Sequence, residues 1–143
     1  MLIPRNEPGV FYLFSRFHEK LGFEEIIDVS TIAPDVIAKR RGEQVRIELE
    51  YKSSRAISHY RVAKEDPRQG KWIKEGKDWV FVLKSGTRKY TVPDPYNEYR
   101  LDKDRGLLLL KTAKKIFGII VCWENDEVFE ENMEVIELEK ALT

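Results

Sequence analysis

The sequence predicts an α/β sandwich with a central mixed β-sheet flanked by helices. A helical apolar stripe near the N-terminus precedes three strand-like segments within residues 23–52. A second helical segment follows, and a continuous apolar run covers Phe117–Trp123. A run of that kind is typical of an interior strand covered on both faces, so helices are expected on both sides of the sheet.

The first predicted element is an N-terminal helix. Asn6 can cap it, Glu7 and Pro8 fall in its first turn, and Gly22 ends it. Its apolar stripe comprises Val10, Phe11, Phe14, Phe17 and Leu21. Glu7 has two interpretations, because it is either an exposed first-turn carboxylate favoured by the helix dipole or an acid directed at the sheet.

Three strands are predicted next, over Phe23–Ile32, Asp35–Lys39 and Gln44–Lys52. The turn residues Arg40–Glu43 allow the second and third strands to be antiparallel neighbours. The third strand alternates, with Val45, Ile47, Leu49 and Tyr51 on one face and Arg46, Glu48, Glu50 and Lys52 on the other. Beyond it we expect a helix over 55–64 capped by Ser53 or Ser54, and a late edge strand over 134–139.

Residues 66–115 interrupt this order and are predicted to be an insertion within one domain, 1–143, whose core is 7–65 and 116–140. Two strands, Asp78–Leu83 and Thr87–Val92, flank a hairpin turn, and Asn97–Lys115 is mostly helical in character. Aromatic residues are interleaved here with cations: Trp72, Trp79, Tyr90, Tyr96 and Tyr99. They can stack nucleic-acid bases, or they can form the small core of the hairpin.

Composition indicates a single soluble cytoplasmic domain. The 143 residues carry no net charge, but the middle of the chain, 52–123, is basic and the last 20 residues are acidic. A local positive potential attracts phosphate, although a mixed solvated surface is the simpler interpretation. The single cysteine excludes an internal disulfide. We find no signal peptide at the N-terminus and no apolar run of membrane-spanning length.

Two acids and a lysine form the candidate site. Glu50 and Lys52 point to the same side of a strand, roughly 6–7 Å apart. If Asp35 faces that side from the paired strand, two carboxylates and an ammonium converge where a divalent cation and a water nucleophile could be held. The alternative is that Glu48, Glu50 and Lys52 are only the solvated face of an amphipathic strand. Acids covered there by the second helix without a cation would be costly.

These residues resemble those of the PD-(D/E)xK nuclease superfamily, which has the restriction-endonuclease-like fold. The likeness rests on Pro34-Asp35 and Glu50-Tyr51-Lys52, with Glu7 on the preceding helix and the later apolar strand Ile119–Trp123. Within that superfamily the chain is most similar to small archaeal and bacterial endonuclease-like proteins of unassigned role. The resemblance covers about 7–65 and 116–140 and leaves the insertion out.

The resemblance implies that Asp35, Glu50 and the Tyr51 carbonyl bind Mg²⁺, with Mn²⁺ as a substitute. Lys52 would orient the attacking water and balance charge near the scissile phosphate. Glu7 is a candidate for a second metal or its water shell, and Glu48 is a supporting residue.

The expected partner is nucleic acid, with DNA favoured, and the resemblance allows a homodimer. The candidate contacts are His59, Arg55, Arg61, Lys84, Arg88 and Lys89. His59 would contact phosphate or assist proton transfer, or it is simply structural. The expected activity is that of a Mg²⁺-dependent DNA endonuclease. The alternatives are a nucleic-acid-binding or assembly module without turnover, and an interaction protein whose acidic tail meets a basic partner.

Overall fold

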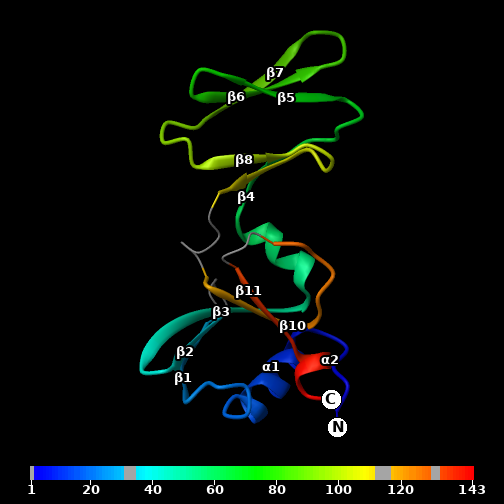
Figure 1. Cartoon of the computed structure of the whole chain (residues 1–143). Helices are drawn as coiled ribbons and strands as arrows, with labels where there is room; N and C mark the ends of the chain where they lie inside the picture. The colour runs from blue at the N-terminus through cyan, green and yellow to red at the C-terminus, as the bar shows by residue number, and fades with distance from the viewer. Residues whose placement is uncertain (1, 31–34, 112–116, 130–132) are drawn as a thin grey trace. The chain divides into compact units, whose positions relative to one another are not determined.

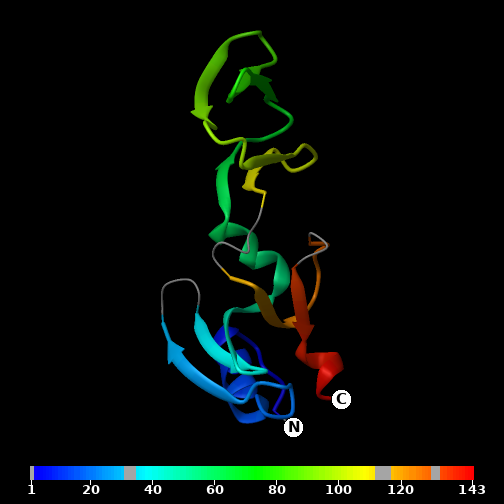
Figure 2. The same cartoon turned by 60° about the vertical axis from the view of Figure 1, so that its left-hand side comes forward.

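The computed structural model describes residues 2–30, 35–111, 117–129 and 133–143 (Figures 1 and 2). The chain forms two compact units. Unit 1 comprises residues 1–59 and 113–143, and unit 2 comprises residues 60–112, where the sequence predicts an insertion over 66–115. Each unit has its own sheets and its own apolar cluster.

A mixed sheet organises unit 1, which confirms the α/β class and the mixed central sheet. The described strands follow the order β1-β2-β3-β10-β11. The first three form an antiparallel meander, whereas β10 is parallel to both β3 and β11. Their bounds are β1 Glu25–Val29, β2 Val36–Arg40, β3 Glu43–Lys52, β10 Ile119–Glu124 and β11 Glu134–Glu137.

The turn between β2 and β3 sets the register of the hairpin. Arg41 has φ 56° and Gly42 has φ 79°, the left-handed conformations that a two-residue hairpin turn requires. Arg40 therefore pairs with Glu43, and the ladder runs to the pair Val36 and Ile47. One step further along this register, Asp35 lies across from Glu48.

The helix α1 (Glu7–Phe17) covers one face of this sheet. The Asn6 side chain caps it as predicted, accepting a hydrogen bond from the Gly9 amide at 3.0 Å. The helix contributes Val10, Leu13 and Phe14 to the core, together with the inward-facing residues of the strands, which are Val36, Ala38, Ile47, Leu49, Ile119 and Val121. Figures 1 and 2 show a short 3₁₀ helix, η1 (Ser53–His59), on the opposite side of β3 and β10.

Several predicted boundaries in unit 1 differ from the structure. The sequence predicts the second helix over 55–64, but η1 ends at His59 and a strand, β4, follows it. Serine and aspartate side chains hold this short helix in place, because Asp126 accepts hydrogen bonds from the Ser54 amide at 2.9 Å and the Ser54 hydroxyl at 2.8 Å. The late strand ends at Glu137 and continues as the short helix α2 (Leu138–Ala141). The predicted positions of Ile32 and Pro34 lie outside the described residues.

The regular elements in the described part of unit 2 are strands. Two three-stranded antiparallel sheets have the orders β4-β9-β8 and β5-β6-β7. The predicted hairpin is confirmed as β6 and β7. The bounds are β4 Arg61–Lys64, β5 Gly70–Glu75, β6 Asp78–Leu83, β7 Arg88–Pro93, β8 Tyr99–Asp102 and β9 Leu107–Leu110.

The predicted helix over 97–115 was wrong for residues 97–111, and 112–115 lie outside the described part. Gly106 has φ 67°, and a Cβ there would lie 1.8 Å from the Glu65 carbonyl oxygen, so this position is a tight turn that only glycine fits. The four leucines after it form β9, of which the first three are buried. A short apolar run bounded by a glycine turn suits a strand better than a helix.

The most apolar segment of the chain is the interior strand β10. Ile119 to Trp123 are all buried, as the continuous apolar run predicts, and Cys122 is a free buried thiol. Burial raises the pKa of this thiol to about 12, so it stays protonated. In the described ranges, no helix is both long enough and apolar enough to cross a membrane.

Candidate metal centre

A buried carboxylate on β3 is the centre of the candidate site. Glu48 is 0% exposed, and neither of its oxygens accepts a hydrogen bond within the described structure. Its Oε1 lies 2.8 Å from His59 Nε2, which is ion-pair distance without hydrogen-bond geometry. An ionised carboxylate buried without hydrogen bonds is costly, so Glu48 requires either a proton, which it can donate in a hydrogen bond to Asp35 or Glu50, or a cation.

Two further ligand atoms converge on Glu48. Glu50 lies two positions along the same face of β3, and its Oε1 is 3.3 Å from His59 Nε2. His59 ends η1, and its ring packs edge-on against Phe117 with 6.5 Å between ring centroids. One ligand atom from each of Glu48, Glu50 and His59 lies within 4.8 Å of the others, an arrangement that could hold a metal ion.

Two more acids, Asp35 and Glu7, act on this group electrostatically but are not among its three converging ligand atoms. Asp35 accepts a hydrogen bond from the Leu49 amide at 2.9 Å, and its charge acts on both Glu48 and Glu7. Glu7 arrives from the first turn of α1, and its charge acts on Glu50. Glu7 and Asp35 also line a cavity of about 340 Å³ between α1 and the sheet. Glu7 is exposed in the first turn of α1, as in the first of its two interpretations, but it lies close enough to the sheet for its charge to act on Glu50.

The electrostatics of the cluster favour bound protons in the metal-free protein. Burial, then the charges of Asp35 and Glu50, raises the pKa of Glu48 to about 9. Burial, then the charge of Glu7, raises the pKa of Glu50, while His59 opposes that shift. Burial, then Asp35, likewise raises the pKa of Glu7. A cation placed among these acids would displace the protons and be attracted by several carboxylates at once.

Lys52 makes an ion pair outside this cluster. Its Nζ lies 3.7 Å from Glu124 Oε2, with the two side chains 43% and 47% exposed. The pair follows from the sheet, because Lys52 and Glu124 are register partners on β3 and β10. The side chain of Tyr51 packs against the core of unit 1, and its carbonyl lies on β3 between Glu50 and Lys52.

The cations predicted to contact nucleic acid have different surroundings. Arg55 acts electrostatically on Glu7, so it lies near the acid cluster. Arg88 forms a two-point ion pair with Glu75, and Lys89 pairs with Glu65 at 2.7 Å. Of the remaining two, Arg61 is exposed on β4, and Lys84 is exposed and acts on Asp66. Part of the basic character of unit 2 is thus neutralised within the unit.

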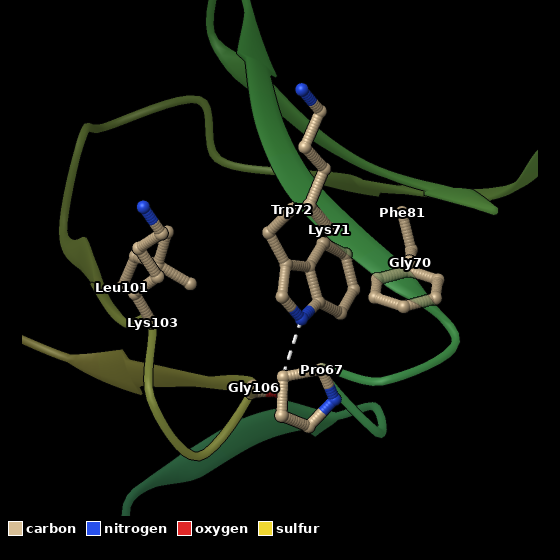
Figure 3. A pocket seen from close by; sticks show the side chains of 8 residues that line it. All are labelled: Pro67, Gly70, Lys71, Trp72, Phe81, Leu101, Lys103 and Gly106. Carbon is tan, nitrogen blue, oxygen red and sulfur yellow. Dashed lines mark hydrogen bonds between the residues drawn. The ribbon is translucent and has the colours of Figure 1, made fainter. Parts of the chain in front are cut away.

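The aromatic residues of unit 2 divide between core and surface. Trp72 is buried, lies 5.3 Å from Phe81 between ring centroids, and donates its indole N–H to the Gly106 carbonyl at 3.0 Å. Figure 3 shows this tryptophan beside a cavity of about 320 Å³ in unit 2. Tyr96, in contrast, is 80% exposed. The burial of Trp72 favours its interpretation as part of a small core.

The pairing of Asp35 with Glu48 is the feature that sequence reasoning missed. The spacing to Lys52 favours Glu50 as the partner acid and leaves Glu48 a supporting role. The signal that could have found the pair is the turn, because a tight two-residue turn at Arg41 and Gly42 fixes a register in which Asp35 lies opposite Glu48.

No protein-family model, curated protein or solved structure matches this chain. The positions and chemistry of the clustered side chains therefore carry the functional conclusion.

Proposed function

We propose that this protein is a metal-dependent nuclease that hydrolyses phosphodiester bonds in DNA. One observation carries the proposal: Glu48 is fully buried, its oxygens accept no hydrogen bond from the described residues, and Asp35, Glu50 and His59 surround it. Several acids gathered around one point disfavour their own ionisation, and a divalent cation removes that penalty.

The residues present fit a divalent cation. Glu48, Glu50 and His59 would hold it, and Asp35 beside Glu48 and Glu7 at the neighbouring cavity would add negative charge. Carboxylate oxygens are the ligands that Mg²⁺ and Mn²⁺ take in proteins. A bound cation would make water easier to deprotonate and would neutralise charge on a phosphodiester.

Two cations of the chain can act on the substrate. Among the described residues, Lys52 pairs with the half-exposed Glu124, and such pairs contribute about 0–1 kcal/mol. Its ammonium can therefore leave Glu124 for a phosphate oxygen at little cost. Arg55, whose charge already reaches Glu7, can bind a neighbouring phosphate.

The test is cleavage of a panel of duplex, single-stranded and branched DNA with Mg²⁺ or Mn²⁺. Glu48→Gln and Asp35→Asn should each lower cleavage by about 10- to 100-fold, because each removes a negative charge that would attract the ion. Glu43→Gln, at the exposed start of the same strand, is the matched control and should cleave like the wild type. No metal-dependent cleavage of any substrate, or full activity of Glu48→Gln, would refute the proposal.

A second candidate function is a nucleic-acid-binding module without turnover. The pairing of Lys52 with Glu124 favours it, because the lysine makes that contact instead of one within the acid cluster. Both candidates predict DNA binding that weakens steeply with salt. Binding without cleavage across the whole panel, with either metal, would favour this module over the nuclease.

A further inference from the structure

An imidazole nitrogen stands among the carboxylates of the candidate centre. We propose that the centre selects a divalent first-row transition ion such as Mn²⁺ over Mg²⁺, and that His59 is the ligand responsible. The inference rests on the metal-dependent function proposed above, which it deepens by naming the class of ion.

The distances are those of neighbouring ligands on one ion. His59 Nε2 lies 2.8 Å from Glu48 Oε1 and 3.3 Å from Glu50 Oε1. Two ligands at right angles on an octahedral ion, each with a bond of about 2.1 Å, are about 3 Å apart. The nitrogen therefore faces the carboxylate oxygens at a separation that a shared ion would produce.

The kinds of ligand distinguish between the ions. Mg²⁺ prefers oxygen ligands, loses its waters reluctantly and is usually held by one or two carboxylates. Imidazole is a good ligand for transition ions, whose affinity for mixed nitrogen and oxygen sites is higher. The burial of Glu48 adds to the difference, because an ion that binds it must give up water on that side.

The surroundings of His59 hold the ring in place. It ends η1, whose first residues are fixed by the hydrogen bonds from Ser53 and Ser54 to Asp126. Phe117 packs against the ring at an interplanar angle of 85°. The side chain remains 33% exposed, so an ion can reach it from solvent. A ligand oriented in advance loses little freedom on binding, which strengthens its influence on the choice of ion.

The experiment measures Mn²⁺ and Mg²⁺ binding to the metal-free full chain. Mn²⁺ binding is followed by electron paramagnetic resonance, and Mg²⁺ affinity is obtained by competition. Pulsed measurements on bound Mn²⁺ should show coupling to a directly bound ¹⁴N nucleus. In His59→Asn that coupling should vanish, and the ratio of Mn²⁺ to Mg²⁺ affinity should fall by about tenfold or more.

The chain provides a matched control in its other histidine. His18 follows α1, where its Nδ1 lies 2.6 Å from the Ser15 carbonyl oxygen. His18→Asn should keep both the ¹⁴N coupling and the affinity ratio. Circular dichroism and the unfolding midpoint of each variant establish that it is folded, and the wild-type spectrum tests the inference without any variant.

The outcomes separate this inference from the proposed nuclease. Bound Mn²⁺ without ¹⁴N coupling, or an unchanged affinity ratio in His59→Asn, overturns the selective role of His59 even if the protein cleaves DNA. Bound Mn²⁺ with the coupling but without cleavage supports the inference and removes only the nuclease function. Failure of the wild type to bind either ion overturns both.

Discussion

Among single residues, Glu48 has the most consequential surroundings. Acids from three other positions act on this group directly or through a neighbour: Asp35 before β2, Glu50 on β3 and Glu7 on α1. The His59 ring is brought against it from η1, with its Nε2 2.8 Å from Glu48 Oε1. Burial and the surrounding negative charges make the ionised form of Glu48 unfavourable.

The metal-free protein should therefore lose stability as the pH rises. The pKa of Glu48 is about 9 in the folded protein against an ordinary value of 4.5, so the folded state retains a proton that the unfolded chain releases. The loss should develop from about pH 4.5 to about pH 9 and amount to at least about 1 kcal/mol. Urea unfolding in a chelator at several pH values, for wild type and Glu48→Gln, measures it. An equally steep loss in Glu48→Gln would contradict the assignment.

The ion pair of Lys52 and Glu124 gives a second prediction. Glu124→Gln should lower the free energy of unfolding by less than about 1 kcal/mol, because both side chains are half-exposed. It should leave cleavage intact or increase it, since Lys52 is then freed for the substrate. Lys52→Ala should abolish cleavage while DNA binding persists. Cleavage and DNA-binding assays on both variants test these expectations. A wild-type cleavage rate in Lys52→Ala would show that the lysine has no part in cleavage.

For single residues, the sequence predicts which side chains share a face of a strand but not how far each one is buried. The alternation along β3 correctly places Glu48 and Glu50 on one side, because the side-chain period of a strand is two. The burial of Glu48 depends on η1 and on its register partner Ile120, which belongs to β10 far along the chain. Such distant covering residues leave no local pattern.

Among the elements, η1 shows how a short helix can position a candidate metal ligand, His59. It is too short to be stable by itself. The hydrogen bonds from Ser54 at its start to the Asp126 side chain stabilise it instead. His59 at its other end is thereby fixed relative to β3. The loop after β10 and the start of η1 act together in orienting the histidine.

Asp126→Ala should weaken this arrangement. The loss of the hydrogen bonds to Ser53 and Ser54 should lower the free energy of unfolding by about 1.5–3 kcal/mol, because the acceptor is charged. It should also weaken Mn²⁺ binding through the misplaced His59. Val128→Ala, at a side chain that is 93% exposed in the same loop, is the control for both measurements. Unchanged stability and Mn²⁺ affinity in Asp126→Ala would show that His59 is positioned by other contacts.

The elements of unit 1 were largely predictable and part of unit 2 was not. Capping by Asn6 and alternation along β3 are local patterns with a direct physical cause. The segment 97–111 contains good helix formers. The left-handed conformation at Gly106 and the pairing of β9 with β4 and β8 nevertheless make the residues on either side of the turn strands. Tertiary pairing overrides a weak local preference in this segment.

For the whole molecule, the chain enters and leaves unit 2 at adjacent residues. The Leu110 amide donates a hydrogen bond to the Tyr60 carbonyl at 3.0 Å. The apolar clusters of the two units share no residue, so each unit has a core of its own. Unit 2 is consequently an insertion whose ends require only a short connection.

Replacement of residues 61–109 by a short Gly-Ser linker should leave unit 1 folded. The residues that flank the removed segment, Tyr60 and Leu110, are already joined by a hydrogen bond, so a short linker can connect them. Mn²⁺ binding should persist, since the acids and His59 all belong to unit 1. DNA affinity and its dependence on salt should fall, because the exposed cations of unit 2 are gone. Calorimetry, Mn²⁺ titration and DNA binding at several salt concentrations test this. Loss of Mn²⁺ binding would show that unit 1 depends on unit 2.

The same junction has a consequence for folding kinetics. Glu50 pairs with Cys122, so β10 joins the sheet beside the acid cluster only after a loop of about 70 residues closes. If unit 2 folds first, the Tyr60–Leu110 contact shortens the free chain to about 20 residues and lowers the closure cost by roughly 1 kcal/mol. Gly106→Ala, which disrupts unit 2, should then slow the folding of a sheet to which it does not belong. Unit 2 would in this way set the rate at which β10 covers the candidate metal centre.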